Sequence, residues 1–257
     1  MKRKLVPALL ALSTTFAFGG DFLQWQDTSL TGLYGTGFEV DPETQQTLTI
    51  EHANGWMWGD FFWFHDAIYF DGDQSSNDKV TYYGEIAPRI SAGKILKKDL
   101  SVAFVKDWLI AGCYEYGEFN GEDFGLQNGL IGVGVDLDVP GFDFFQLNVY
   151  QRFGLDGPGG DCVQITPVWK LSTPVGKSTF IFDGYADWVV NSDGGYSDNL
   201  HFNPQFKFDI GVLMGLEDGA LLAGAEYDLW LNKYGIKDSA GFKTDQSAIS
   251  ALVQYHF

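Results

Sequence analysis

Cysteine is scarce in this sequence of 257 residues, and Cys113 and Cys162 are its only two copies. Their separation provides no Cys-x-x-Cys pair, so the sequence predicts no metal site and no cofactor. An oxidising compartment permits a disulfide between them, but two packed free thiols are the simpler interpretation.

Positive charge is also scarce. The chain carries 16 Lys and Arg against 34 Asp and Glu, a formal net charge of −18. Proteins that bind nucleic acid neutralise its phosphates with Lys and Arg. The acidic balance therefore excludes simple electrostatic binding of nucleic acid.

Catalytic motifs are missing as well: the sequence has no Gly-x-Ser-x-Gly, no His-Glu-x-x-His and no Gly-rich phosphate loop that opens a helix. Its four histidines, His52, His65, His201 and His256, are scattered. A lipid-modifying barrel enzyme needs a histidine beside a serine, and His201 is near Ser197 only in sequence. We therefore predict structural or interfacial histidines, no catalytic residues and no enzyme. A barrel enzyme acting on lipid is the alternative.

The N-terminus is the only strongly apolar stretch. Residues 1–4 are basic, residues 5–18 are mostly apolar, and small residues precede Asp21. The apolar run is shorter than the roughly 20 residues that a membrane-spanning helix needs. The pattern predicts a cleaved secretory signal peptide over residues 1–20, followed by a mature protein of residues 21–257.

After the signal peptide no run is apolar enough for a membrane helix, although the chain is 45% hydrophobic and 16% aromatic. A transmembrane β-barrel reconciles these observations, because each strand is apolar only on its lipid-facing side. The 22 Phe, 12 Tyr and 8 Trp suit aromatic girdles at the two membrane interfaces.

Twelve segments separated by Gly, Asp, Asn and Pro are predicted to be strands. They are residues 29–39, 46–55, 59–70, 80–91, 99–116, 127–138, 142–154, 162–171, 178–190, 200–211, 220–231 and 246–257. Short connections alternate with longer polar ones at 71–79, 117–126, 155–161, 191–199 and 232–245. This alternation is typical of outer-membrane barrels with both termini in the periplasm. The predicted fold class is all-β, a single closed antiparallel transmembrane β-barrel of about twelve strands.

The last segment, residues 247–257, alternates apolar and polar side chains and stops on Phe257. An exposed apolar edge strand is an aggregation hazard in a soluble protein, whereas in a barrel it closes onto the first strand. We expect the barrel assembly machinery to recognise Phe257 at the end of this strand. We expect Ser250, Gln254 and His256 to face the lumen.

Polar and apolar residues alternate within the other strands too. In the seventh segment Asn148, Tyr150 and Arg152 oppose Leu147 and Val149. A charge that faces lipid at mid-depth costs about 2–4 kcal/mol, so the polar faces are expected to line the lumen.

Three prolines, Pro88, Pro167 and Pro204, fall inside predicted strands, where proline removes a ladder donor. A closed barrel has no free edge, so we expect bulges or strand ends near the rim at these positions.

Residues 56–70 carry aromatic side chains on both faces of a strand. If Phe61 and Trp63 face lipid, Phe62 and Phe64 face the lumen. Girdle and packing roles are one interpretation; the other is a lumen on which a planar ligand stacks, worth about 1–3 kcal/mol per base. Parity along the strands predicts these ligand-binding candidates: Phe62, Phe64, Asp66, Tyr83, Glu85, Arg89, Tyr150, Arg152, Tyr185, Asp187, Lys207, Glu226, Asp228 and Trp230.

Several segments resemble one known family. They are residues 39–70, Gly84–Arg89 (GEIAPR), Phe104–Trp108 (FVKDW), Asn148–Tyr150 and the mature start Asp21–Leu30. In this order they resemble the nucleoside-specific channel-forming outer-membrane family (Tsx-like, including the OmpK group). Each motif is short, and the resemblance runs across essentially the whole mature chain.

The resemblance implies a monomeric twelve-stranded barrel in the outer membrane, surrounded by lipid and lipopolysaccharide, with a narrow lumen that passes nucleosides and deoxynucleosides. Some members of the family also serve as phage or colicin receptors. A plugged structural or adhesive barrel is a second alternative, beside the barrel enzyme.

Overall fold

The computed structural model describes residues 22–71, 80–119, 122–157, 159–192 and 195–257. The predicted signal peptide lies outside these residues, as does nearly all of the predicted loop 71–79.

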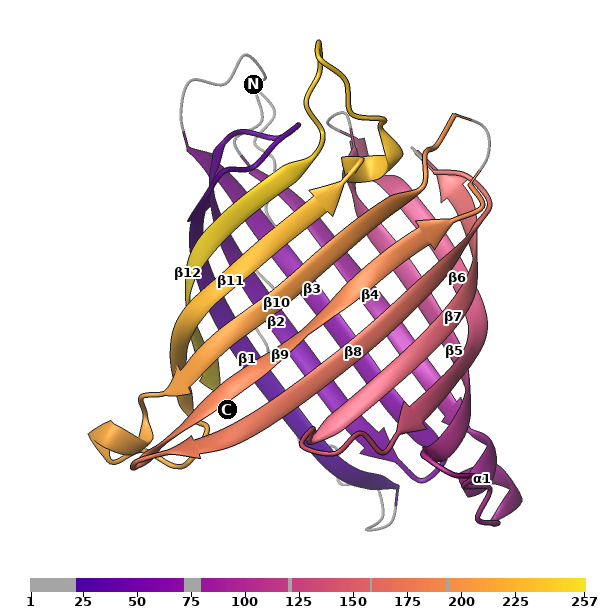
Figure 1. Cartoon of the computed structure of the whole chain (residues 1–257), viewed down its shortest axis with the longest axis vertical. Helices are drawn as coiled ribbons and strands as arrows, with labels where there is room; N and C mark the ends of the chain where they lie inside the picture. The colour runs from indigo at the N-terminus through magenta and orange to yellow at the C-terminus, as the bar shows by residue number, and fades with distance from the viewer. Residues whose placement is uncertain (1–21, 72–79, 120–121, 158, 193–194) are drawn as a thin grey trace.

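Twelve antiparallel strands close into one barrel, in which each strand pairs with the next and β1 pairs with β12 (Figure 1). Their bounds are β1 (Leu23–Thr36), β2 (Thr44–Trp56), β3 (Gly59–Asp71), β4 (Val80–Ser91), β5 (Val105–Phe119), β6 (Glu122–Leu137), β7 (Phe144–Asp156), β8 (Cys162–Val175), β9 (Ser178–Val190), β10 (Asn199–Asp209), β11 (Leu221–Leu231) and β12 (Gln246–His256). The closing seam runs from Ser29↔His256 to Thr36↔Ile249. The predicted fold class is therefore confirmed.

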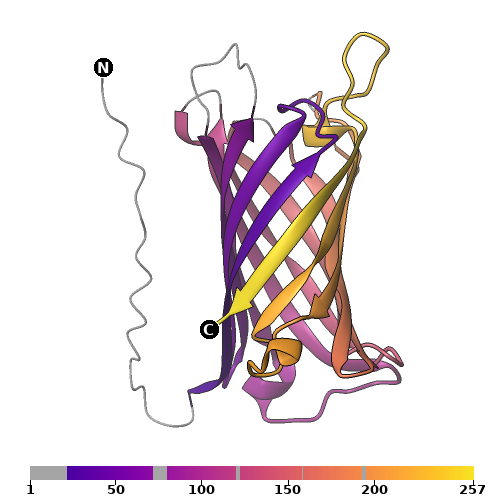
Figure 2. The same cartoon turned by 90° about the vertical axis from the view of Figure 1, so that its left-hand side faces the viewer.

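β1 begins and β12 ends at one end of the barrel, and the loop before β12 lies at the other end (Figure 2). The predicted division into short connections at the first end and long ones at the second is wrong. At the first end residues 92–104 join β4 to β5 and residues 210–220 join β10 to β11, and both connections are longer than residues 37–43, which join β1 to β2 at the second end. Short turns occur at the first end as well. A short turn joins β8 to β9, where Val175 pairs with Ser178 and Gly176 has a φ of 64°. Short helices α1 (Ala92–Leu96) and η1 (Val212–Met214) lie at this end, and η2 (Lys233–Gly235) lies in the loop before β12. We call the two ends periplasmic and outer.

Three strands begin five or six residues away from their predicted starts, and one of them, β6, begins at Glu122 rather than at residue 127. β1 begins at Leu23 rather than Ser29, and its extra part pairs with β2 alone because the partners on β12 reach only Ser29. β5 begins at Val105 rather than at residue 99, because Val102 and Val105 exchange backbone hydrogen bonds of 3.0 and 2.9 Å in a tight turn.

The prediction of β-bulges at the three prolines is wrong. Pro88, Pro167 and Pro204 each pair with one neighbouring strand, opposite Phe61, Leu147 and Gly184 respectively. On the other side pairing is interrupted and then resumes in the same register. A proline has no N–H to donate to that second neighbour. The sheet therefore loses ladder bonds locally, without a shift in register.

Side chains alternate between the bilayer and the lumen. On β6, Ile131 and Val133 are 58% and 64% exposed on the outer face, whereas Asn128 is fully buried inside. Ala111, Leu130 and Tyr150 form a small apolar cluster on the inner face. Cys113 and Cys162 are free thiols. None of the helices in the described residues is both long enough and apolar enough to cross a membrane.

Candidate functional site

The buried charged side chains of the described residues lie in the barrel lumen or at its two ends. They are Arg89, Glu115, Arg152, Lys207, Asp209 and Lys233. A buried charge is costly unless it is paired and hydrogen-bonded. The partners of these groups therefore define the lumen.

Arg89 organises the periplasmic part of the lumen. Its Nε and Nη2 atoms donate to the two carboxylate oxygens of Asp60 at 2.8 and 2.7 Å. Its Nη1 donates to Asp136 at 2.9 Å, so one guanidinium joins β3, β4 and β6. The planar fork of arginine suits this bidentate geometry.

Arg152 forms the second ion pair. Its Nη2 lies 2.6 Å from Oε2 of Glu115, and the same oxygen accepts a 2.8 Å hydrogen bond from Asn128. Nη1 of Arg152 donates to the hydroxyl of Tyr196 at 3.3 Å. Because Tyr196 precedes β10 in an outer loop, this contact brings a loop side chain onto the lumen wall.

Lys207 links opposite parts of the wall. Its Nζ donates to Asp183 at 2.7 Å and to Gln254 at 2.9 Å. Gln254 in turn donates to Glu51 at 3.0 Å, so the chain of contacts runs from β9 and β10 through β12 to β2.

Four further lumen carboxylates have neutral partners in the part of the chain that the structure describes. Asp66 accepts from Thr49, and Asp187 accepts from Thr166. They add negative charge to the lumen, because none of the four accepts a hydrogen bond from a Lys or Arg side chain of the described residues. The other two pairs are Tyr83 donating to Glu85 at 2.8 Å and Gln205 donating to Glu226 at 2.8 Å.

Aromatic rings follow the inner face in two groups. Phe62 and Phe64 have ring centroids 5.9 Å apart, and Phe64 and Tyr83 are 5.8 Å apart. We call these three residues the aromatic ladder. Phe62 is 37% exposed although it faces inward, so the ladder is accessible from the lumen.

The second group surrounds His201. Its ring stacks on Trp230 with centroids 3.9 Å apart, and its Nδ1 lies 3.3 Å from the hydroxyl of Tyr185. Its Nε2 is 3.4 Å from Asp228. His201 is thus a member of an aromatic and acidic cluster on β9, β10 and β11.

The outer mouth is narrowed by loop contacts. Nζ of Lys233 lies 2.8 Å from Asp41 and donates to Gln246 at 2.7 Å. A Cβ on Gly235, where φ is 68°, would lie 2.3 Å from the ring of Tyr196. Only glycine lets the two loops approach this closely.

Beyond the membrane, Asp238 holds the loop before β12. Its carboxylate accepts from the backbone N–H groups of Thr244 at 2.8 Å and Asp245 at 3.2 Å, and it pairs with Lys243 at 3.1 Å. The backbone donors, followed by Lys243, lower the pKa of Asp238.

Every predicted candidate lies on the inward-facing parity of its strand, but the structure divides the set. Phe62, Phe64, Tyr83 and Glu85 lie together on β3 and β4. Tyr185, Asp228 and Trp230 meet through His201. The remaining candidates have separate partners: Arg89 with Asp60, Arg152 with Glu115, Lys207 with Asp183, Asp66 with Thr49, Asp187 with Thr166, Glu226 with Gln205, and Tyr150 with Ala111 and Leu130.

Sequence reasoning missed several lumen groups. Strand parity could have identified Glu51 and Glu115, since each lies an even number of residues from inward-facing neighbours, Thr49 and Cys113 respectively. No local pattern identifies Tyr196, because a loop side chain reaches the lumen only through the fold. Within the described residues, no group of three or more His, Cys, Asp or Glu is arranged to hold a metal ion.

The closed barrel, its apolar outer face and its charged lumen define a class of protein, the outer-membrane β-barrels. Residues 21–257 match the family described as nucleoside-specific channel-forming protein, Tsx, and the chain belongs to that family. It is accordingly an outer-membrane protein.

Individual relatives agree with this assignment. The chain is 30% identical over 169 residues to the nucleoside-specific channel-forming protein Tsx of Klebsiella pneumoniae, a match covering 60% of this chain and 58% of that protein. It is 26% identical over 205 residues to outer membrane protein OmpK of Vibrio parahaemolyticus serotype O3:K6, covering 77% and 75%. Among solved structures, the KdgM porin aligns with a TM-score of 0.50 and 11% identity, covering 89% of this chain and 99% of that one, which supports the fold alone.

Proposed function

We propose that the protein is a passive outer-membrane channel for nucleosides and deoxynucleosides, and that these bind weakly along the lumen. The aromatic ladder beside Glu85 and Asp66 carries the proposal. A nucleobase stacks on an aromatic ring with about 1–3 kcal/mol. Ribose hydroxyls are donors, and carboxylates such as Glu85 are acceptors that favour them. Family membership supports the same permeant class.

The lumen charge favours this permeant over its phosphorylated form. Carboxylates outnumber the lysines and arginines that face the described lumen, so a phosphate would meet repulsion. A neutral nucleoside meets none, and weak stacking lets it leave again.

The experiment is flux into proteoliposomes. Adenosine and thymidine should enter faster than sugars of similar size, with saturation. Phe64→Ala should raise the half-saturating concentration about 5- to 150-fold, the equivalent of about 1–3 kcal/mol of stacking. Phe206→Ala is the matched control, because Phe206 is 43% exposed on the bilayer face and should leave flux unchanged. Equal entry of nucleosides and sugars would end the proposal.

We further propose that the protein is not an enzyme, because the polar contacts of His201 are Tyr185 and Asp228 in the aromatic cluster described above. Lipid A that is altered by the purified protein but not by His201→Ala would overturn this statement.

The same proposal includes a monomeric state, insertion by the barrel assembly machinery and phage binding through the acidic outer loops. A bilayer conductance near zero would favour the plugged, adhesive alternative.

A further inference from the structure

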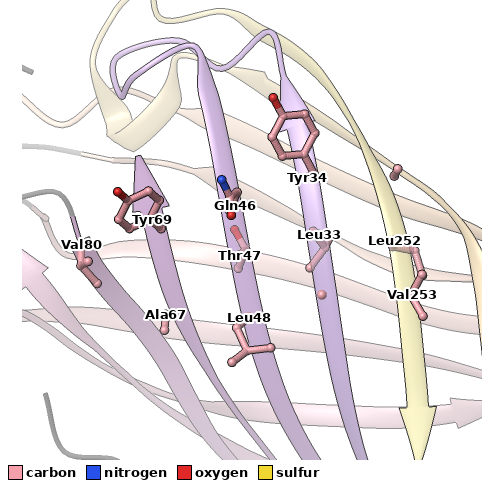
Figure 3. A pocket seen from close by; sticks show the side chains of 12 residues that line it. Leu33, Tyr34, Gln46, Thr47, Leu48, Ala67, Tyr69, Val80, Leu252 and Val253 are labelled. Atoms are coloured by element: carbon pink, nitrogen blue, oxygen red, sulfur yellow. The ribbon is translucent and has the colours of Figure 1, made fainter. Parts of the chain in front are cut away.

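A groove of about 600 Å³ opens on the outside of the barrel, over β1, β2, β3 and β12 (Figure 3). We call it the lateral groove. It is lined by Gly32, Leu33, Tyr34, Gln46, Thr47, Leu48, Ala67, Tyr69, Val80, Ala251, Leu252 and Val253. It lies in the outer half of the barrel, because Tyr34 is near the end of β1 at Thr36 and Gln46 is near the start of β2 at Thr44.

Strand register creates the hollow. On the outer face, Gly32 pairs with Leu48 on one side and with Val253 on the other, and Leu48 pairs with Ala67. Neighbouring strands thus place small residues on both sides of Leu48. A Cβ on Gly32 would meet no atom within 4 Å, so there is room for a larger side chain or a ligand.

The groove is polar only at the end nearest the outer loops. Tyr34, Gln46 and Tyr69 are direct cross-strand partners and form one row there (Figure 3). Their side chains have no hydrogen-bond partner among the described residues. The next row toward the middle of the membrane, Leu48 and Val253, is apolar.

We propose that the lateral groove binds one acyl chain of lipopolysaccharide. The outer face of the barrel already contacts the bilayer, and the groove is continuous with that face. Its position in the outer half places it in the leaflet that contains lipopolysaccharide. The apolar end fits the hydrocarbon, while the two hydroxyls and the carboxamide fit the ester and hydroxyl oxygens near the head of the lipid.

Membrane physics favours this occupant over a second copy of the chain. A polar group left unsatisfied in the bilayer is costly. An apolar β-barrel face would leave Tyr34, Gln46 and Tyr69 without partners, whereas the oxygen-rich region of the lipid provides them. Tyr34 and Tyr69 are 55% and 41% exposed and therefore stand at the rim of the groove, where a narrow chain can pass between them.

The test is native mass spectrometry of the full-length protein, released from detergent and titrated with lipid A or with phosphatidylethanolamine. Wild type should retain one lipid A, in preference to the phospholipid. Gly32→Leu should lower lipid A affinity at least about tenfold by filling the groove. Tyr34→Phe and Tyr69→Phe should each lower it about two- to tenfold, the loss of one net hydrogen bond.

Val133→Leu is the matched control, because Val133 is 64% exposed on the bilayer face and does not line the groove. It should bind lipid A as wild type does. All variants should keep the gel mobility and nucleoside flux of wild type, since the substituted residues face away from the lumen. This separates failure of the site from failure of the proposed channel. The proposal is overturned if Gly32→Leu binds lipid A normally, if the phospholipid binds equally well, or if the groove instead mediates a dimer that Gly32→Leu disrupts.

Discussion

The buried pair Arg152–Glu115 provides the sharpest test of how the lumen is held together. The two side chains are 11% and 6% exposed and 2.6 Å apart. Replacing Arg152 with Met preserves most of the side-chain volume but leaves the Glu115 carboxylate with only Asn128 as a hydrogen-bond donor in the described lumen. Removing one partner of a buried pair typically costs about 3–5 kcal/mol, mostly because the remaining charge is uncompensated.

We therefore expect Arg152→Met to lower the free energy of unfolding by about 3 kcal/mol or more. The double variant Arg152→Met/Glu115→Gln should recover most of this loss, because the neutral amide needs no counterion. The measurement is urea-dependent unfolding and refolding in lipid vesicles, followed by tryptophan fluorescence and by gel mobility.

An exposed pair of similar geometry is the control. Lys106 lies 2.8 Å from Asp138, but the two side chains are 55% and 68% exposed. Lys106→Met should cost no more than about 1 kcal/mol, since water screens such pairs. The reasoning is refuted if Arg152→Met costs as little as Lys106→Met, or if the double variant is no more stable than Arg152→Met alone.

Three further predictions concern the lumen, the C-terminus and the outer loop. At pH 9 a KCl gradient should give a reversal potential that favours K⁺ over Cl⁻, because acidic side chains outnumber basic ones in the described lumen, and Glu226→Gln should reduce it; a preference for Cl⁻ would contradict the acidic lumen. Deleting Phe257 should impair assembly in cells yet leave the nucleoside preference of refolded protein intact, and normal assembly of the truncated chain would count against its role. The pKa of Asp238 is lower in the folded protein than the usual value for aspartate, about 4. Its ionised carboxylate therefore stabilises the loop fully above about pH 4, and this stabilisation is lost as the pH falls through the pKa of the folded protein. Asp238→Asn should therefore make trypsin cleavage after Lys243 faster at neutral pH, whereas unchanged cleavage would show that the carboxylate does not hold the loop.

Much of the fold was predictable because alternation is a local property. Each strand that faces lipid on one side and the lumen on the other repeats every two residues, whatever its partner. This is why the inward positions of Asn148, Tyr150 and Arg152 follow from their order alone. The prediction failed at Pro167, where the closed sheet tolerates a missing donor in unchanged register.

The sequence by itself therefore determined the expected location in the outer membrane, the all-β class and the number of strands. It also determined whether a strand residue such as Arg152 faces the lumen or the bilayer. Only the tertiary structure decided which inward charges meet, since Arg152 and Glu115 come from β7 and β5 and depend on the stagger of the strands between them. The same is true of Tyr196, which reaches Arg152 from a loop, and of the lateral groove, where Gly32 meets Val253 only when the barrel closes. Pairing depends on register across the sheet, and the period of two within a strand carries no information about it.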